Sequence, residues 1–132
     1  MIPLSATADF PAVFDLATLD GINGFRIDGV DADDQSGFSV SSAGDVHGDG
    51  IDDLIIGPRN ADPDGDASAG ESYVVFGDAG GFSASLDPAT LDGTNGFRID
   101  GVDKGDLSGA SVSSAGDVNG DGIGDIIVGA RG

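Results

Sequence analysis

The sequence predicts an all-β protein built from β-propeller blades, and three observations support this fold class. The chain repeats itself: with a shift of 72 residues, 36 of 53 aligned pairs between 8–60 and 80–132 are identical without a gap. Each repeat unit holds four short β-prone runs separated by Gly-rich turns, and no segment shows a sustained helical period. Four short antiparallel strands in a repeated unit are typical of a propeller blade.

The four strands of one unit can be placed within residues 36–103. GFSVSSAGD alternates apolar and polar residues and predicts a first strand near 38–42. The apolar run DLIIG predicts a second strand at 53–57, ESYVVFG a third at 71–77 and GFRIDGV a fourth at 96–102. We therefore expect residues 36–103 to form one complete blade, with the first acidic loop inside it.

The parts on either side of this blade match its complementary halves. Residues 1–35 carry the run IPL and a first copy of GFRIDGV, which we expect to be the third and fourth strands of a half blade. Residues 104–132 carry the first and second strands of another half blade. Unpaired strand edges are unfavourable in water. With two blade equivalents per chain, we expect either the remainder of a longer propeller or self-association through complementary half blades into a trimer or tetramer ring.

The strongly acidic composition narrows the class of partners. The net charge is −19, with 24 acidic and 5 basic residues, so nucleic acid and anionic membrane surfaces would repel the chain. The lack of Cys excludes disulfides and thiolate metal sites. No apolar run is long enough to span a membrane, and the opening MIPLSATADF lacks the features of a signal peptide. Many acidic side chains must therefore be solvated or neutralised by metal.

A nine-residue loop between the first and second strands of each unit concentrates the acidic side chains. It reads DVHGDGIDD at 45–53 and DVNGDGIGD at 117–125. Side chains at loop positions one, three, five and nine and the carbonyl at seven can converge on one centre, because Gly at position six permits a tight turn. Such oxygen-rich donor sets suit Ca²⁺ better than Mg²⁺, which demands stricter geometry. The candidate ligands are Asp45, His47, Asp49, the Ile51 carbonyl and Asp53 in the first loop, and Asp117, Asn119, Asp121, the Ile123 carbonyl and Asp125 in the second.

Two Ca²⁺ ions per chain are expected, and His47 sets the two loops apart. Imidazole nitrogen is a poor Ca²⁺ ligand, so the first site is expected to be weaker, or to use water where the second has Asn119. An EF-hand is excluded, because its closing Glu at position twelve is replaced by Ile56 or Val128. A solvated acidic turn is the competing interpretation, since Asp and Gly favour turns. Two copies that share Asp at positions one, five and nine and Gly at positions four and six favour metal binding.

Other polar features have simpler interpretations. The acidic loop at 61–70 occurs once and lacks a closing ligand, so we expect it to be solvated. Four of the five basic residues form the repeat-related pairs Arg26 with Arg98 and Arg59 with Arg131. In so acidic a chain, these guanidinium groups are expected to neutralise neighbouring Asp side chains.

With these motifs the chain resembles the FG-GAP repeat family, the blades of integrin alpha-subunit β-propellers and their bacterial relatives. The resemblance rests on SGFSVSSAGDVHGDGIDDLIIG at 36–57, YVVFG at 73–77 and SGASVSSAGDVNGDGIGDIIVGA at 108–130. The name-giving residues match less well, because Ser36 and Ser108 stand in place of Phe. The resemblance implies Ca²⁺ bound between the first two strands of a blade, a ring of about seven blades, and ligand-binding loops on one face.

These observations lead to one expected function and two alternatives. We expect a non-enzymatic, calcium-binding propeller module of an exported surface or adhesion protein of bacterial type, with a protein or carbohydrate ligand. A structural or engineered self-assembling propeller fragment without its own ligand is the first alternative. The second is an Asp-dependent hydrolase, which is disfavoured because His47 is the single His and every repeated Asp belongs to the loop or to a turn.

Overall fold

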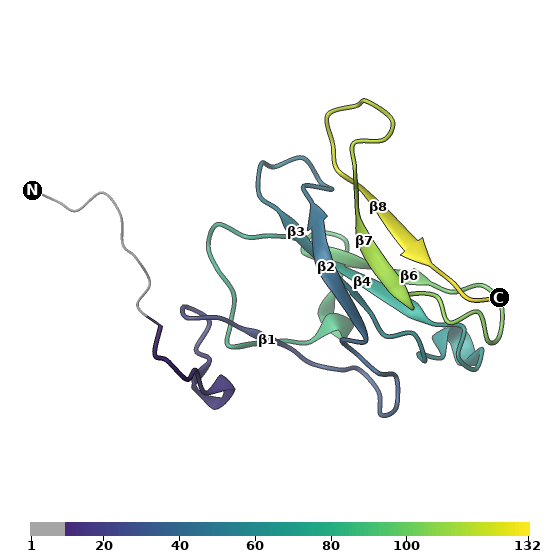
Figure 1. Cartoon of the computed structure of the whole chain (residues 1–132), viewed down its shortest axis with the longest axis horizontal. Coiled ribbons are helices and arrows are strands. Elements are labelled where there is room, and N and C mark those ends of the chain that lie inside the picture. The colour runs from purple at the N-terminus through teal and green to yellow at the C-terminus, as the bar shows by residue number, and fades with distance from the viewer. Residues whose placement is uncertain (1–9) are drawn as a thin grey trace, which may run out of the picture.

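The computed structural model describes residues 10–132 and shows an all-β molecule with three short 3-10 helices (Figure 1). Its strands are β1 (Arg26–Ile27), β2 (Ser39–Gly44), β3 (Asp53–Gly57), β4 (Glu71–Val75), β5 (Ser85–Leu86), β6 (Gly96–Asp100), β7 (Ser111–Gly116) and β8 (Asp125–Gly129). The 3-10 helices are η1 (Leu16–Thr18), η2 (Pro63–Gly65) and η3 (Pro88–Thr90). None of the helices in this part of the chain is long and apolar enough to cross a membrane.

The central element is a four-stranded antiparallel sheet in the order β2-β3-β4-β6. These are the four strands that the sequence predicts, with ends that differ by one or two residues. The first strand runs on to Gly44, whereas the third and fourth end at Val75 and Asp100. Beyond the end of the third strand, the backbone N–H of Gly77 donates to the Asp53 side chain.

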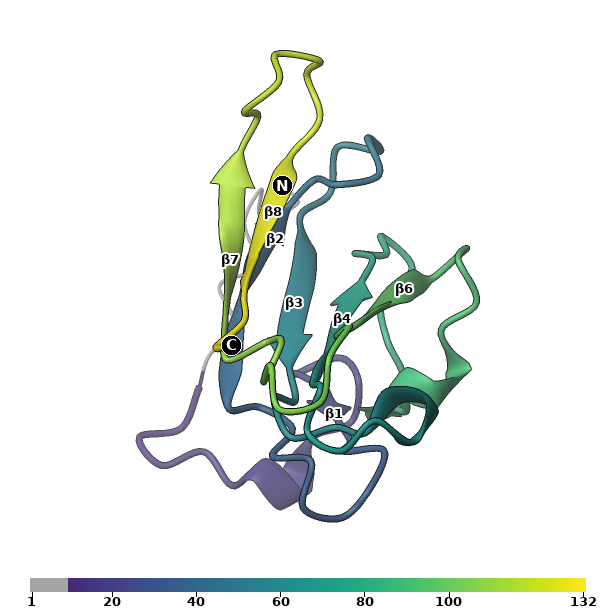
Figure 2. The same ribbon diagram turned by 90° about the vertical axis from the view of Figure 1, so that its right-hand side faces the viewer.

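The second copy of the first two strands forms the hairpin β7–β8, which stands as a separate two-stranded sheet. Its register repeats that of β2–β3, including a bulge at Ser114/Gly116 that matches the one at Ser42/Gly44. Figure 2 shows the hairpin lying against β2 and β3. The sequence repeat therefore produces the same local structure twice, and the two copies pack on each other.

The hydrophobic core lies between these two sheets. Ala43, Ile55 and Val74 are fully buried on one face of the four-stranded sheet. The hairpin packs on this face through Val112, Ile126 and Val128. Burying a Val or Ile side chain contributes about 1.5–3 kcal/mol, so this contact holds the hairpin in place.

The backbones of the two repeats also come close to each other where Gly57 meets Gly109. A Cβ added to Gly57 would lie 2.2 Å from the carbonyl oxygen of Gly109, so a side chain cannot be accommodated. The Ser39 hydroxyl donates to that same carbonyl at 2.6 Å. Glycine at this point thus lets the backbones of the two repeats lie in direct contact.

The N-terminal copy of GFRIDGV behaves differently from the second copy. Within the predicted strand, only Arg26–Ile27 is extended as β1, which pairs in parallel with β5. The second copy, β6, pairs with β4 over its whole length. The run IPL, predicted as the third strand of the N-terminal half blade, lies outside the described residues.

Two smaller predictions hold in part. In the acidic loop at 61–70, Asp62, Asp64 and Asp66 are exposed as expected, whereas Ala61, Ala69 and Gly70 are buried and Gly70 forms a parallel bridge with Ser108. Arg26 and Arg98 pair with Asp28 and Asp100 as expected. Arg59 does not: its guanidinium lies 3.6 Å from the Phe38 ring centroid and donates to the Gln35 side chain.

Candidate metal centre

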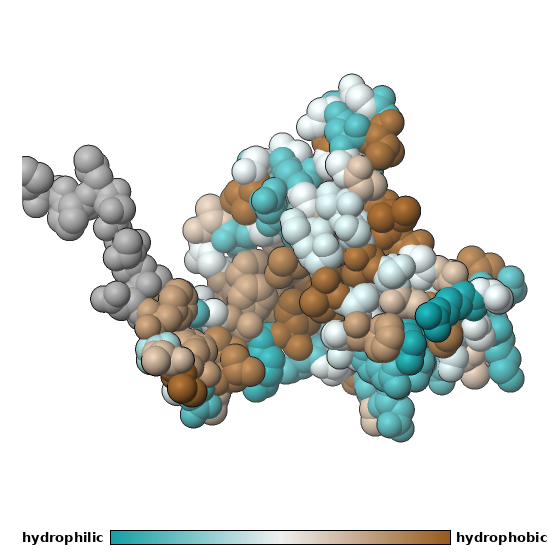
Figure 3. Space-filling view, in the orientation of Figure 1, coloured by the Kyte–Doolittle hydropathy of each residue, from teal (hydrophilic) through white to brown (hydrophobic). Residues whose placement is uncertain are grey.

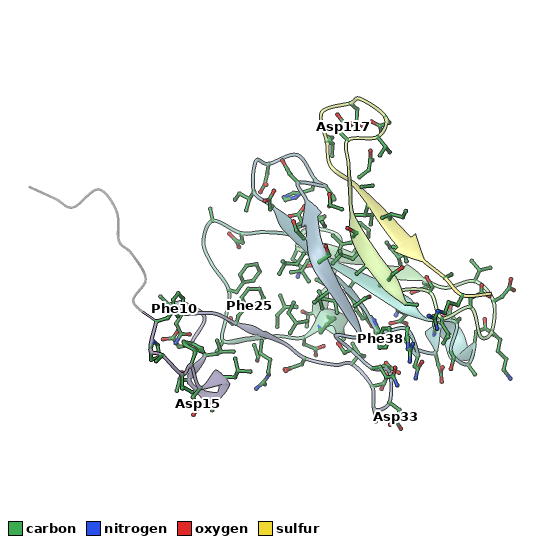
Figure 4. All side chains as sticks on the ribbon, viewed as in Figure 1. Phe10, Asp15, Phe25, Asp33, Phe38 and Asp117 are labelled. Atoms are coloured by element: carbon green, nitrogen blue, oxygen red, sulfur yellow. The ribbon has the colours of Figure 1, made fainter. Side chains whose placement is uncertain are left out.

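The two acidic loops project from the same end of the molecule. One joins β2 to β3 and the other joins β7 to β8, and both extend beyond the ends of their strands (Figures 1 and 2). Asp117 marks the second of them in Figure 4. Because the two hairpins pack side by side, the loops become neighbours.

The first residue of each loop organises the backbone around its carboxylate. Asp45 accepts hydrogen bonds from the N–H groups of Gly48, Asp49 and Gly50 at 2.7, 3.1 and 2.8 Å. These bonds stabilise the ionised form, and the one from Gly50 contributes most to a pKa of Asp45 below its usual value. Bonds of the same lengths reach Asp117 from Gly120, Asp121 and Gly122.

Two glycines in each loop take up the conformation that this arrangement needs. Gly48 and Gly50 have φ values of 80° and 87°, and Gly120 and Gly122 have values of 78° and 88°. Residues with a Cβ rarely adopt such angles. The Gly-Asp-Gly pattern is therefore required by the backbone path, and it brings three N–H groups onto one carboxylate.

His47 occupies the interior of the first loop. Its Nε2 lies 3.0 Å from Asp49 Oδ2, and its Nδ1 lies 3.1 Å from Asp53 Oδ2. The ring also stacks on Phe76, with centroids 4.2 Å apart and planes 8° from parallel. The hydrogen bond with Asp53 is the main cause of a raised pKa of His47. Protonated imidazole can thus neutralise part of the negative charge of the loop.

The last loop residue, Asp53, is fully buried and ties the loop to the rest of the sheet. Its Oδ2 accepts from the Val46 N–H and its Oδ1 accepts from the Gly77 N–H, both at 2.8 Å. In the second loop, Asp125 accepts from Val118 at 2.7 Å but is partly exposed. The two loops are therefore alike in their own backbone and different in their surroundings.

The donor chemistry fits a hard divalent cation. In the first loop, Asp45, His47 and Asp49 each place one potential ligand atom within 4.8 Å of the other two. Asp45 Oδ2 accepts a single N–H bond, which leaves it a lone pair for a metal ion. The second loop offers the Asn119 amide oxygen in place of imidazole, so its side-chain donors are all oxygen, as Ca²⁺ prefers. The remaining predicted ligands, among them the Ile51 and Ile123 carbonyls, stay predictions.

Comparison with known proteins agrees with this loop architecture. The FG-GAP repeat family model matches residues 108–132, which include β7, the second loop and β8. The chain is also similar to integrin alpha-PS2 of Drosophila melanogaster, with 37% identity over 112 residues, and the match covers 82% of this chain. The chain belongs to the FG-GAP repeat family. The match covers 7% of the relative, so the chain spans a small part of that protein.

The two FG-GAP loops contact each other directly. The Gly124 N–H of the second loop donates to the Asp45 carbonyl of the first at 2.8 Å. A Cβ on Gly124 would lie only 3.1 to 3.4 Å from backbone atoms of Asp45. The first loop has Asp52 at the equivalent position. The lack of a side chain at Gly124 thus lets the second loop lie against the backbone of the first loop.

Sequence reasoning did not identify Phe76 and Gly77 as parts of the first FG-GAP loop site. They follow β4, more than 20 residues away, and reach the loop only because β4 pairs with β3. Both also line a cavity of about 410 Å³ beside His47 and Asp49. The YVVFG run predicts a strand, but nothing in its composition indicates that its last residues contact an acidic loop.

Proposed function

We propose that this chain is a calcium-binding β-propeller module of an extracellular, adhesion-type protein, and that its role is non-enzymatic. The observation that carries the proposal is the duplicated loop. Two separate segments share the same hydrogen-bond pattern around an ionised Asp, and the second of them lies within the stretch that the FG-GAP repeat family model matches. A turn that served only to reverse the chain would not need three carboxylates in each copy.

The proposed role of the metal follows from the charge and the topology of the loops. Asp45, Asp49 and Asp53 lie within one hairpin turn, and their mutual repulsion opposes folding. Bound Ca²⁺ would neutralise these carboxylates and tie the ends of β2 and β3 together. Two ions would change the formal charge from −19 to −15, since each adds two positive charges. Binding energy would add to folding stability, because the unfolded chain has no preformed site.

The non-enzymatic part of the proposal rests on how the polar residues are used. The sequence contains one His and no Cys. That His, His47, lies within the first loop between Asp49 and Asp53. Backbone N–H groups within the loops donate to the side chains of Asp45, Asp49, Asp53 and Asp125, as expected for a structural turn.

The proposed location and ligand follow from the integrin-like similarity. The relative is an integrin alpha chain, which favours a surface location for this chain too. Calcium sites of extracellular modules bind at about 10⁻⁴–10⁻³ M, a range that suits two exposed loops of this kind. The ligand would be a protein or a carbohydrate held by loops on one face of the propeller.

The proposal can be tested by calorimetric titration of Ca²⁺ into chelator-treated protein. We expect two binding events per chain, and each of the variants Asp45→Asn and Asp117→Asn should lose one of them. Asp64→Asn is the matched control, because Asp64 is an exposed acid outside both loops and Asn tolerates its φ of 55°. Lack of Ca²⁺ binding by the unmodified chain would refute the proposal, and Mg²⁺ in place of Ca²⁺ would correct the identity of the metal.

A further inference from the structure

The packing of the two repeats within one chain provides a template for a contact between chains. The core face of the four-stranded sheet is defined here by Ala43, Ile55 and Val74. The hairpin covers it with Val112, Ile126 and Val128, and Ile99 of β6 packs at the same place. Both surfaces recur in the repeat, so each should have a counterpart elsewhere on the chain.

The counterpart of the core face lies on the hairpin and is exposed. A shift of 72 residues takes Ala43 to Ala115 and Ile55 to Ile127. Ile55 is 0% exposed, whereas Ile127 is 60% exposed, and Ala115 is exposed too. Figure 3 shows hydrophobic side chains gathered along this side of the molecule. An apolar surface that is buried in one repeat is thus open in the other.

The counterpart of the covering surface lies on the other side of the β2–β3 sheet. The same shift takes Val112 to Val40, Val128 to Ile56 and Ile99 to Ile27. Val40 is 65% exposed. Together with Phe25, these three residues line a groove of about 310 Å³. The groove therefore has the walls of the core contact but lacks the Ala and Ile side chains that would fill it.

The two counterparts lie on opposite sides of the molecule. Alternate residues of a strand point to opposite faces of a sheet, so Val40 and Ile56 point away from Ala43 and Ile55. Phe25 lies on the groove side, and the hairpin that ends in the Asp117 loop lies on the other (Figure 4). The Ile127 surface of one chain consequently cannot reach the groove of that chain.

The outer edge of the hairpin is also open. Among the described residues, β8 pairs only with β7, whereas its counterpart β3 pairs with β2 and β4. An unpaired edge of this kind favours the addition of another strand. The third and fourth strands that would complete the blade have their sequence counterparts in residues 1–35.

From these observations we infer that copies of the chain associate head to tail. The hairpin β7–β8 of one copy inserts Ala115 and Ile127 into the groove of a second copy, lined by Phe25, Ile27, Val40 and Ile56. The open edge of β8 lies at this contact and is available to pair with a strand of the second copy. The inference rests on the proposed propeller function and names the partner of the module, a second copy. Because the two surfaces differ, the contact is heterologous, and its repetition gives a ring where the rotation between neighbouring copies closes and an open filament where it does not.

The test uses two variants, Ile127→Lys and Val40→Lys, each of which disables one of the two surfaces. In Ca²⁺, we expect the unmodified chain to be oligomeric by sedimentation velocity and each variant alone to be monomeric. An equimolar mixture should form a one-to-one dimer, because the intact groove of the first variant accepts the intact hairpin of the second. Both substitutions lower the net negative charge from −19 to −18, so lost association cannot come from added repulsion.

Ile22→Lys is the matched control, since Ile22 is 95% exposed and belongs to neither surface. It should associate as the unmodified chain does. An unmodified chain that stays monomeric, or a mixture that does not dimerise, would overturn the inference and leave the groove to another part of a longer protein. Calcium titration of the unmodified chain separates the two proposals: two sites with no association would leave the proposed function intact and remove only this inference.

Discussion

At the residue scale, the third loop position offers a comparison inside one chain. It holds His47 in one loop and Asn119 in the other, while both loops share Asp at positions one, five and nine and Gly at positions four and six. The imidazole ring bonds to Asp49 and Asp53 and stacks on Phe76, so it fills the space where a ligand oxygen would be expected. A cation bound at the first loop must therefore displace the imidazole ring or bind beside it.

Exchange of these two residues is expected to exchange the affinities of the loops. His47→Asn should strengthen Ca²⁺ binding at the first loop by about tenfold, or about 1.4 kcal/mol, because an amide oxygen replaces a poor nitrogen donor. Asn119→His is the mirror variant and should weaken the second loop by a similar factor. The measurement is a calorimetric titration of both variants and the unmodified chain. Unchanged constants in both would show that position three does not bind the ion.

Gly124 is a second position where one residue has a large expected effect. Its N–H bonds to the Asp45 carbonyl, and an added Cβ would meet the Asp45 backbone at 3.1 to 3.4 Å. Gly124→Ala should lower the free energy of unfolding by about 1 kcal/mol, a typical cost for a point mutation that disturbs packing. Gly80→Ala is the control, since its nearest atoms belong to the flexible Asp78 side chain. Equal unfolding midpoints in urea for the two variants would contradict the proposed loop contact.

At the element scale, β4 and β6 share a buried acidic group. Glu71 is 6% exposed, accepts a short hydrogen bond from the Tyr73 hydroxyl and lies 3.6 Å from the Arg98 guanidinium. Burial outweighs these two favourable contacts and raises the pKa of Glu71 above 4.5. Burial and the same hydrogen bond also raise the pKa of Tyr73. The folded state consequently binds the Glu71 proton more tightly than the unfolded chain does.

This difference predicts how Glu71→Gln changes the pH dependence of stability. Below pH 4.5 the carboxyl is protonated in both states, and its contribution is fully present; as pH rises through the higher folded pKa, that contribution is lost. Gln is neutral at every pH, so the variant does not lose this stability. Its free energy of unfolding should therefore rise relative to that of the unmodified chain between pH 4.5 and 7. Urea unfolding of both proteins at these two pH values measures the difference. Asp100→Asn controls for a lost Arg98 contact, and parallel pH curves for Glu71→Gln and the unmodified chain would refute the argument.

The elements also show how far the sequence could predict this fold. Alternation in GFSVSSAGD and the apolar run DLIIG were enough to place β2 and β3, because burial of one face requires that pattern. The backbone of each acidic loop followed from its Gly positions. The pairing of β1 with β5 could not be predicted, since two residues carry no periodic pattern. Nor could the contacts of Phe76 with His47 and of Gly124 with Asp45, which depend on how separate hairpins pack.

At the scale of the whole molecule, net charge and assembly oppose each other. Copies with a charge of −19 repel, and the repulsion between exposed groups is screened only beyond about 8 Å at physiological ionic strength. Two Ca²⁺ would remove four of these charges. The second loop adds a direct connection to assembly, because its edge strand, β8, is where a second copy would bind.

The position of Asp125 makes this connection specific. In the first loop, Asp53 Oδ1 is held by the Gly77 N–H that follows the third strand of the blade. Asp125 is partly exposed beside the open edge of β8, so a backbone N–H of a second copy would take the place that Gly77 has beside Asp53. Calcium binding at the second loop and association of chains should strengthen each other by the same factor, as linkage requires.

We therefore expect the association constant in saturating Ca²⁺ to exceed that in chelator by about tenfold or more, a coupling of about 1.4 kcal/mol. Sedimentation equilibrium at matched ionic strength measures both constants, with KCl replacing the screening that Ca²⁺ provides. Asp117→Asn, which disables the second loop, should associate weakly in either condition. Asp45→Asn should keep most of the calcium effect, because the first loop is completed within its own chain by Gly77. If both variants lose the effect equally, general charge neutralisation accounts for the coupling, and the proposed role of Asp125 is wrong.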